Sequence, residues 1–375
     1  MTAAPSLLTM VLGFLLVLGP LVVLHELGHY LVGRAFGIKA EAFSVGFGKE
    51  LAGFTDMRGT RWKLSALPLG GYVQFAGDMN PASAPSPDQD NLTPAERAHT
   101  FHAKPVWQRA LTVLAGPVTN LICAVAIFAA FNLAYGRAVA VPEVQAFAPG
   151  SSAQAAGLQV GDRIVAVSGN KIDSFTQILE YVVPYPGRTI PIAVKRGEQT
   201  LVIPVKIAAS VESDRFGNEA KVGRIGVAGG RGELVPVGPV EAVTLGFEQS
   251  FGVMRMMVAG IGQIVTGERS FQELGGPIKI AKYSGEQLSL GWLPFVQFAA
   301  LISINLAFIN ILPIPGLDGG HLAFYAAEAV RRRPLGLRSQ EWAVRTGVAL
   351  VLTLMLFVTI NDIVTLPFFG SVFGG

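Results

Sequence analysis

Two histidines and a glutamate form the most chemically informative pattern in this 375-residue chain. They lie in His25-Glu26-Leu27-Gly28-His29, where the imidazoles are four residues apart and therefore share one face of a helix. Such a pair can bind one Zn²⁺, and the glutamate between them is placed to act as a general base toward a water molecule. The HExxH pattern also arises by chance in long sequences, so its surroundings decide how much weight it carries.

A catalytic zinc site usually has three protein ligands and one open position, so a third ligand is needed. The metzincin extension of the motif is absent, because Val32 and Ala35 occupy the positions of its glycine and histidine. The remaining candidates are Glu41, His99, His102, Asp318 and His321. We expect Asp318, because prolines before it and glycines after it predict an irregular segment, which a membrane tolerates only inside protein or beside a wet cavity. His99 and His102 lie in a polar loop and are expected to be solvated.

The distribution of charge indicates which elements position these residues. Only 15% of the residues are charged and 51% are hydrophobic, with a mean hydropathy of +0.47, whereas soluble domains have about 25% charged residues. Four charge-poor stretches are each long enough to cross a bilayer as a helix. The net charge of +3 is not gathered in a basic tract, which argues against a nucleic-acid partner. The single cysteine, Cys123, rules out an intramolecular disulfide and is expected to pack in an apolar run.

The sequence therefore predicts a polytopic α-helical membrane protein with four transmembrane helices, a membrane-associated β-sheet and one extramembrane α+β domain. The expected segments are transmembrane helix 1 with HExxH (1–36), a cytoplasmic-side membrane-associated β-hairpin or sheet with a loop (37–105), transmembrane helix 2 (106–136), a periplasmic domain (137–233), a periplasmic amphipathic or interfacial segment (234–290), transmembrane helix 3 with the LDGG loop (291–320), a cytoplasmic loop (321–342) and transmembrane helix 4 (343–367).

Positive charges predict the orientation of these spans, because cytoplasmic loops carry an excess of lysine and arginine. The charges that flank the spans are Arg34, Lys39, Lys104, Arg109, Arg331, Arg332, Arg333 and Arg338. They place both connections that carry them in the cytoplasm, and the long segment between spans two and three outside. Residues 236–267 are apolar enough to imitate a fifth span, but Glu241, Glu248 and Arg255 recur every seven residues and would form one stripe of an interfacial helix. A fifth span is the alternative, and it would break the agreement on orientation.

Two extramembrane segments suggest ways to hold a polypeptide. Residues 42–48 and 62–67 alternate like strands, and Gly70, Gly71 and Tyr72 continue as a further strand. A free sheet edge near the zinc could accept an extended substrate by strand addition, although an ordered cytoplasmic loop is the simpler alternative. The turns, short helices and strands of residues 137–233 resemble one PDZ domain of the kind found in bacterial proteases, which would bind a peptide or chain terminus.

Three motifs in chain order resemble the site-2 protease family of intramembrane zinc metalloproteases. They are His25-Glu26-Leu27-Gly28-His29, Gly116-Pro117-Val118-Thr119-Asn120, and Asn310-Ile311-Leu312-Pro313-Ile314-Pro315-Gly316-Leu317-Asp318-Gly319-Gly320. Within the family, the chain is similar to the RseP type, the regulator of sigma-E protease, although many of its members carry two PDZ domains. The resemblance implies His25, His29 and Asp318 as zinc ligands and Glu26 as the base. It further implies that Asn305 and Asn310 contact the substrate backbone near the metal, whereas helix-interior hydrogen bonding is the alternative for both.

The expected activity is hydrolysis of a peptide bond within the membrane, with Zn²⁺ as cofactor. The resemblance implies a bacterial inner-membrane location, an active site toward the cytoplasm, and single-span substrates such as a pre-trimmed anti-sigma factor or remnant signal peptides. A second hypothesis is a non-catalytic PDZ scaffold with a structural metal, but closed structural sites normally have four protein ligands and only three are assigned here. A transporter would need paired charges or repeats through several spans, and none is evident.

Overall fold

The computed structural model describes residues 5–77, 93–139, 141–213, 219–229, 233–267, 275–333 and 336–364. The chain divides into two compact units, which we describe one at a time. The first unit combines Met1–Ile127 with Gly276–Ile360, and the second combines Phe128–Gly275 with Asn361–Gly375. Every residue predicted to bind zinc or substrate lies in the first unit.

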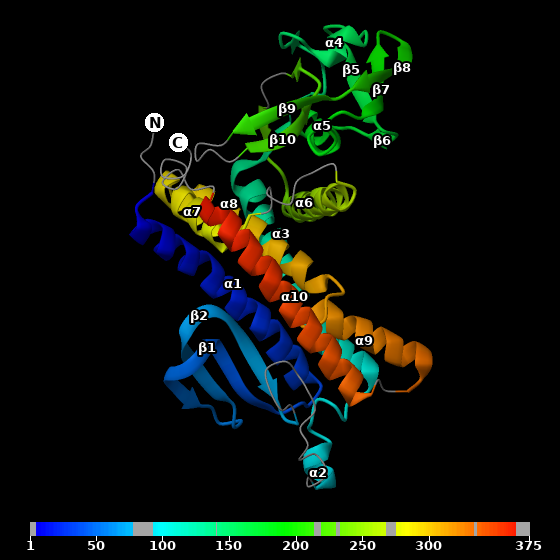
Figure 1. The fold of residues 1–375 in the computed structure, drawn as a ribbon. Coiled ribbons are helices and arrows are strands. Elements are labelled where there is room, and N and C mark those ends of the chain that lie inside the picture. The colour runs from blue at the N-terminus through cyan, green and yellow to red at the C-terminus, as the bar shows by residue number, and fades with distance from the viewer. Residues whose placement is uncertain are drawn as a thin grey trace. The chain divides into compact units, whose positions relative to one another are not determined.

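Four helices in the described part of the chain are long and apolar enough to span a membrane, which confirms the predicted number. They are α1 (Leu7–Ala35), α3 (Val106–Tyr135), α8 (Trp292–Ile311) and α10 (Leu337–Val364), whose candidate span is Arg338–Ile363 (Figure 1). Helix α8 ends where Leu312 takes a ψ of 139°, because a residue before proline is pushed out of the helical region.

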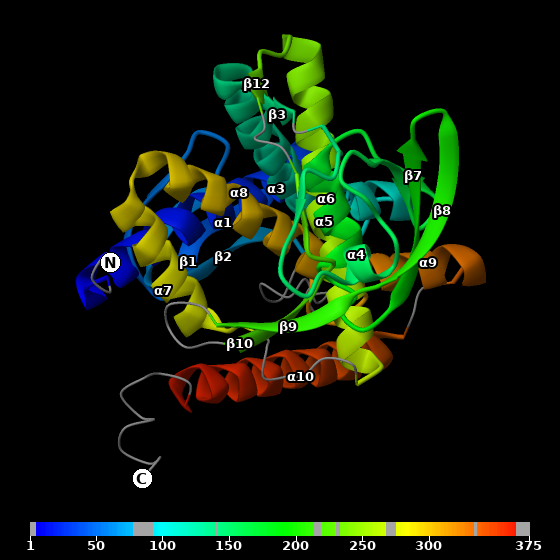
Figure 2. The ribbon, with the colours of Figure 1, turned by 90° about the horizontal axis from the view of Figure 1, so that it is seen from above.

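Helix α7 (Pro277–Leu290) lies beside α1 and α8 in the first unit (Figures 1 and 2). Gly13 of α1 faces the backbone of Ser284 and Gly285, at a distance that would force any side chain at position 13 into that backbone. Next to this close approach, a buried apolar cluster joins α1 to α8 and includes Val17 and Phe295. These contacts fix the first half of α1 against two helices that follow it by more than 250 residues.

Helix α9 (Asp318–Arg331) begins directly after the proline-containing break that follows α8. Arg109 in the first turn of α3 holds it in place, because its Nη2 donates to Glu328 Oε1 over 2.7 Å and its guanidinium lies over the Tyr325 ring. Both side chains of this ion pair are largely buried. The start of α9, with Asp318, is therefore held near the faces of α3 and α1.

A long antiparallel hairpin, β1 (Ala40–Thr55) and β2 (Arg61–Phe75), lies along α1 (Figure 1). Residues 42–45 pair with 61–64 on one side and with 71–74 on the other, and 61–65 pair again with 50–55. The hairpin therefore folds into four strand segments. Within the described residues, the segment 71–75 is paired with another strand on one side only. The short helix α2 (Pro94–Arg97) follows, with a capping box between Thr93 and Glu96.

The second unit is built around a four-stranded antiparallel sheet in the order β6-β5-β7-β8. Its elements are β3 (Arg137–Val139), β4 (Ala146–Phe147), α4 (Ser152–Ala155), β5 (Arg163–Val167), β6 (Asn170–Lys171), α5 (Phe175–Val182), β7 (Thr189–Arg196), β8 (Gln199–Lys206), β9 (Ala208–Ser213), β10 (Glu219–Arg224), β11 (Val227–Ala228), β12 (Glu233–Val235) and α6 (Pro239–Val265). Its core is formed by fully buried aliphatic side chains such as Ile164, Ile192 and Val205. Helix α6, on which the fifth-span alternative rested, is not among the four candidate spans.

Candidate metal centre

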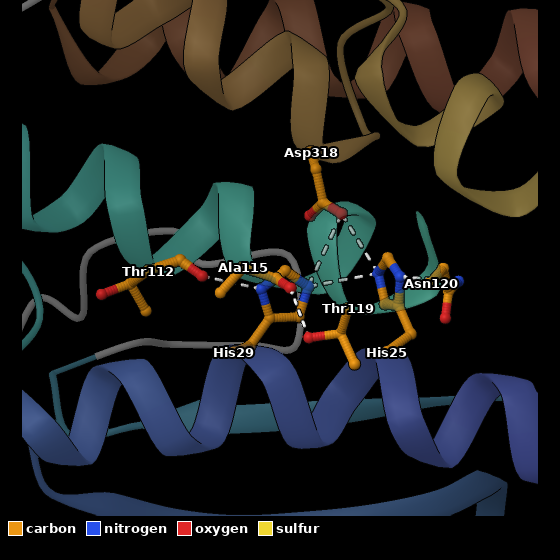
Figure 3. Close-up of polar contacts among 7 residues, drawn as sticks. All are labelled: His25, His29, Thr112, Ala115, Thr119, Asn120 and Asp318. Atoms are coloured by element: carbon orange, nitrogen blue, oxygen red, sulfur yellow. Dashed lines mark hydrogen bonds and ion pairs between the residues drawn. The ribbon is translucent and has the colours of Figure 1, made fainter. Parts of the chain in front are cut away.

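The side chains of His25, His29 and Asp318 converge on one point (Figure 3). His25 Nε2 lies 3.1 Å from Asp318 Oδ2 and 3.2 Å from His29 Nε2, and His29 Nε2 lies 3.5 Å from the same Asp318 oxygen. In the described part of the chain, this is the one group of at least three histidine, cysteine, aspartate or glutamate side chains that could hold a metal ion. The structure thus brings together the three residues that the sequence and the resemblance selected.

The triangle of ligand atoms has the size that zinc requires. A tetrahedral Zn²⁺ with bonds of about 2.0–2.1 Å holds neighbouring ligand atoms about 3.3–3.4 Å apart, and the three distances here scatter around that value. Asp318 Oδ2 is buried without a well-oriented hydrogen bond in the described structure. Two imidazoles and one carboxylate are ordinary catalytic zinc ligands. The residues therefore fit a Zn²⁺ ion with one coordination position left open.

Helix geometry explains how two of these ligands meet. Positions 25 and 29 are one turn apart on α1, so both rings project from one face, and they contact edge to face with centroids 4.8 Å apart. His29 Nδ1 donates to the Thr112 carbonyl oxygen of α3 over 2.9 Å, which turns Nε2 toward the metal position. The third side chain of the group, Asp318, comes from the first residue of α9, 289 positions after His29.

Glycine at position 116 makes room for the centre, a role that the sequence analysis did not assign to it. A Cβ atom built on Gly116 would overlap the His29 imidazole and lie 2.8 Å from His25 Nε2. The two helices cross closely on the other side as well, because a Cβ on Gly28 would overlap the Thr119 hydroxyl and the Ala115 carbonyl. Both glycines occur inside the motifs quoted above, but their function depends on a helix crossing that local sequence does not show.

A cavity of about 540 Å³ surrounds the three converging side chains. Glu26 lines it, and the backbone N–H of Val73 donates a hydrogen bond to the Glu26 carboxylate. The cavity is also lined by Gly70, Gly71, Tyr72, Asn310 and His321. The Glu26 carboxylate, the three converging side chains and a strand edge therefore share one cavity.

Apart from His321, which lines the cavity, the remaining sequence candidates lie elsewhere. Asn305 does not line the cavity, because five residues separate it from Asn310 and rotate it by about 140° around α8. Glu41 is exposed, and His99, which is also exposed, donates from Nδ1 to the Gly37 carbonyl oxygen. His102 packs edge to face on Phe101. None of these four joins the group of converging ligand atoms.

The fold and the site together define a class: a polytopic membrane protein with a three-residue metal site built on an HExxH helix. Comparison with known proteins makes this specific, because Peptidase family M50 matches residues 13–354. The chain belongs to this family, the site-2 proteases.

Similar proteins cover nearly the whole chain. The "Putative zinc metalloprotease Atu1380" of Agrobacterium fabrum is 44% identical over 371 residues, which span 98% of each chain. A protein of Rhizobium meliloti with the same designation is 43% identical over 93% of this chain and 95% of its own. Metalloprotease MmpA of Caulobacter vibrioides is 35% identical over 95% of this chain and 96% of its own. The protein is thus a zinc metalloprotease with a multi-pass membrane architecture.

Proposed function

We propose that the protein is an intramembrane protease of the RseP type that hydrolyses a peptide bond within or near the transmembrane segment of single-span membrane proteins. The observation that carries this proposal is the convergence of His25, His29 and Asp318 beside Glu26, on and next to helices able to span a membrane. Following the resemblance, the substrates are pre-trimmed anti-sigma factors and remnant signal peptides.

The chemical role of each residue follows from its side chain. His25, His29 and Asp318 hold the Zn²⁺, which when bound supplies Lewis-acid activation of a water molecule and of the scissile carbonyl. Glu26 accepts the proton of the attacking water and passes it to the leaving amine. The N–H of Val73 orients the Glu26 carboxylate for this transfer. Asn310 lines the same cavity and offers an amide to the substrate backbone.

The free edge of strand segment 71–75 is suited to bind an unwound substrate. In a strand, the N–H and C=O groups of one residue point to the same side and those of the next residue point to the other. Because Val73 N–H is directed to Glu26, the backbone groups of Gly71 face the same side. We propose that an extended substrate pairs there, with Gly70, Gly71 and Tyr72 as its first contacts. Pairing would satisfy backbone groups that lose their helical hydrogen bonds in the membrane.

We propose that the second unit contains one PDZ domain that faces the periplasm and binds a peptide or chain terminus. A cavity of about 520 Å³ lies between α5 and residues 222–228. Its walls are apolar, with Phe175, Ile178 and Val182 from α5. A groove between a helix and a strand is the site where PDZ domains add a peptide strand.

We propose that α6 lies in the outer face of the bilayer. Its polar side is occupied within the unit, since Arg255 donates to the Tyr181 hydroxyl and Gln249 pairs with Asn132. Large apolar side chains remain exposed along the rest of the helix: Val240, Val243, Phe247, Phe251, Val258, Ile261 and Val265. A helix with its polar side toward protein and its apolar side outward fits an apolar surrounding.

Glu26→Gln tests the central proposal, with Glu41→Gln as a matched control at an exposed position. Both variants and the wild type are purified in detergent with zinc and given a single-span reporter substrate. We expect Glu26→Gln to retain zinc and lose cleavage, and Glu41→Gln to behave as wild type. Persistent cleavage by Glu26→Gln would refute the assigned base. Zinc binding by wild type without cleavage of any helical substrate would favour the scaffold alternative.

The placement of α6 is tested by labelling. Single cysteines at Gly238 and Gly276, in a Cys123→Ala background, are probed with a membrane-impermeant reagent in intact spheroplasts. An interfacial α6 predicts equal accessibility at both positions. Opposite accessibility would demonstrate a fifth crossing and overturn the proposed topology.

A further inference from the structure

Asn120 of α3 is fully buried and lies against the outer nitrogen of a metal-facing histidine (Figure 3). Its Nδ2 is 3.3 Å from His25 Nδ1. Its Oδ1 is buried and has no hydrogen-bond partner within the described residues. A buried carbonyl oxygen without a partner is unfavourable, so the orientation of this amide has to be decided from its neighbour.

The chemistry of His25 determines which end of the Asn120 amide faces it. A neutral imidazole that binds a metal through Nε2 carries its hydrogen on Nδ1, and that nitrogen must then donate. An amide NH₂ group cannot accept this hydrogen, whereas an amide oxygen can. The two ends of an asparagine amide have nearly the same shape, and their assignment follows from the hydrogen-bond network. Rotation of the Asn120 amide by 180° places Oδ1 at His25 Nδ1, where it can accept the hydrogen that this nitrogen carries.

The partner of the other histidine has the same polarity. His29 Nδ1 lies 2.9 Å from the Thr112 carbonyl oxygen, which can only accept, so His29 also carries its hydrogen on Nδ1. Thr112 and Asn120 are two turns apart on α3, and each faces one histidine of α1. Asn120 is itself fixed from α8, because Ser303 Oγ donates to its backbone carbonyl over 2.7 Å.

We infer that Asn120 is a positioning residue whose Oδ1 accepts the Nδ1 hydrogen of His25 and so holds His25 Nε2 toward the zinc. This inference rests on the proposed zinc site. Outer partners of this kind typically change metal affinity by about 10–100-fold when removed. Because the partner of His29 is a backbone carbonyl, Asn120 is the one of the two that a substitution can remove directly.

The test compares Asn120→Leu, which keeps the shape without an acceptor, with Asn120→Asp, which keeps an acceptor and no donor. Asn132→Leu is the matched control, since Asn132 is a buried asparagine of the same helix that pairs with Gln249. Zinc affinity is measured on the purified full-length protein by competition with a chromophoric chelator. We expect zinc to bind about 10–100-fold more weakly to Asn120→Leu, and within a few-fold of wild type to Asn120→Asp and Asn132→Leu.

The outcomes separate this inference from the function it rests on. His29→Ala reports on the site itself: zinc binding retained in both His29→Ala and Asn120→Leu would overturn the site and the inference together. Zinc lost from His29→Ala but bound normally by Asn120→Leu would overturn the inference alone. A folded Asn120→Asp protein that binds zinc as weakly as Asn120→Leu would also overturn it, because the role would then need the donor end of the amide. Thermal unfolding of each variant identifies any that fails to fold, and Asn120→Ala, which also lacks a side-chain acceptor, then replaces Asn120→Leu.

Discussion

Arg109 and Glu328 form a buried ion pair, with Nη2 and Oε1 2.7 Å apart, that joins the first turn of α3 to the last turn of α9. The same α3 presents Gly116 to the two histidines, and the same α9 begins with Asp318. The pair therefore fixes the helix that carries the third ligand relative to the helix that shapes the metal centre. Neither residue contacts the metal position, so the ion pair affects it only by fixing the relative position of α3 and α9.

Arg109→Ala should destabilise the protein and weaken zinc binding. Removing one partner leaves the other charge buried, at a cost of about 3–5 kcal/mol. The control is Arg345→Ala, whose pair with Glu341 is exposed and one turn apart on α10, where such pairs contribute about 0–1 kcal/mol. Thermal unfolding in detergent measures the difference. Equal unfolding temperatures for the two variants would contradict the role of Arg109, and replacing both Arg109 and Glu328 by leucine should recover much of the loss.

Gly116→Ala should abolish zinc binding and proteolysis while the protein still folds. The added methyl group would overlap the His29 ring and crowd His25, so the two nitrogens could not keep their separation. Gly19→Ala is the matched control, because it lies in the transmembrane helix α1 with no neighbouring atom within 4 Å of its Cβ position. Zinc content by mass spectrometry and reporter cleavage are the measurements. A Gly116→Ala protein with a full complement of zinc would show that the helix crossing is looser than described.

Gly71→Ala should reduce cleavage and leave zinc content unchanged. A Cβ at this position would lie 2.7 Å from the Ser44 carbonyl oxygen and 3.1 Å from Glu26 Cγ, so it would displace the strand edge and the base together. We expect a loss of about 10-fold or more in kcat/KM, which corresponds to about 1.4 kcal/mol of transition-state stabilisation. Leu64→Ala, an exposed position on the same strand β2, serves as control. Unchanged activity in Gly71→Ala would argue against substrate pairing at this edge.

Asp162 should make the second unit sensitive to acid. Its carboxylate is 1% exposed and accepts two hydrogen bonds of 2.7 Å from Arg196 and one of 2.8 Å from the Gln159 N–H. The Arg196 guanidinium holds the pKa of Asp162 below its usual value. The unfolded chain therefore binds the proton more readily, so this stabilisation is complete above pH ~4 and is lost as the pH falls below that value.

Hydrogen exchange of β5 and β7, measured between pH 6 and pH 3, follows this loss after correction for the intrinsic exchange rate. In Asp162→Asn the pH-dependent step should disappear and protection should be lower already at pH 6. Asp173→Asn is the control, because its pair with Lys171 is largely exposed. A step of the same size in Asp162→Asn and wild type would assign the acid sensitivity to another group.

Sequence reasoning selected His25, His29 and Asp318, which the structure brings together, because their signals are local. HExxH places two imidazoles on one helix face, and prolines before glycines mark the break that frees Asp318. The charge deficits gave the four spans for a similar reason, since each is a continuous run. The PDZ domain and the segment boundaries stay predictions.

The roles of Gly116 and Asn120 could not be read in the same way. They depend on how α3 crosses α1, and a crossing is set by packing between segments about 90 residues apart in the chain. The double pairing of residues 61–65 in the hairpin likewise depends on bulges that alternation does not reveal. Asn305 and Asn310 were both expected to contact the substrate. Helix periodicity alone places them on different faces of α8, so this difference could have been predicted from the sequence.

The distance along the chain between His29 and Asp318 has a consequence for biosynthesis. His25 and His29 are synthesised at the start of translation, but Asp318 is made only after more than four fifths of the chain. A nascent or truncated chain that ends before Asp318 therefore carries the HExxH helix without the complete metal centre. Under the proposed assignment, Zn²⁺ binding by all three side chains waits until Asp318 has been synthesised and α9 has packed against α3.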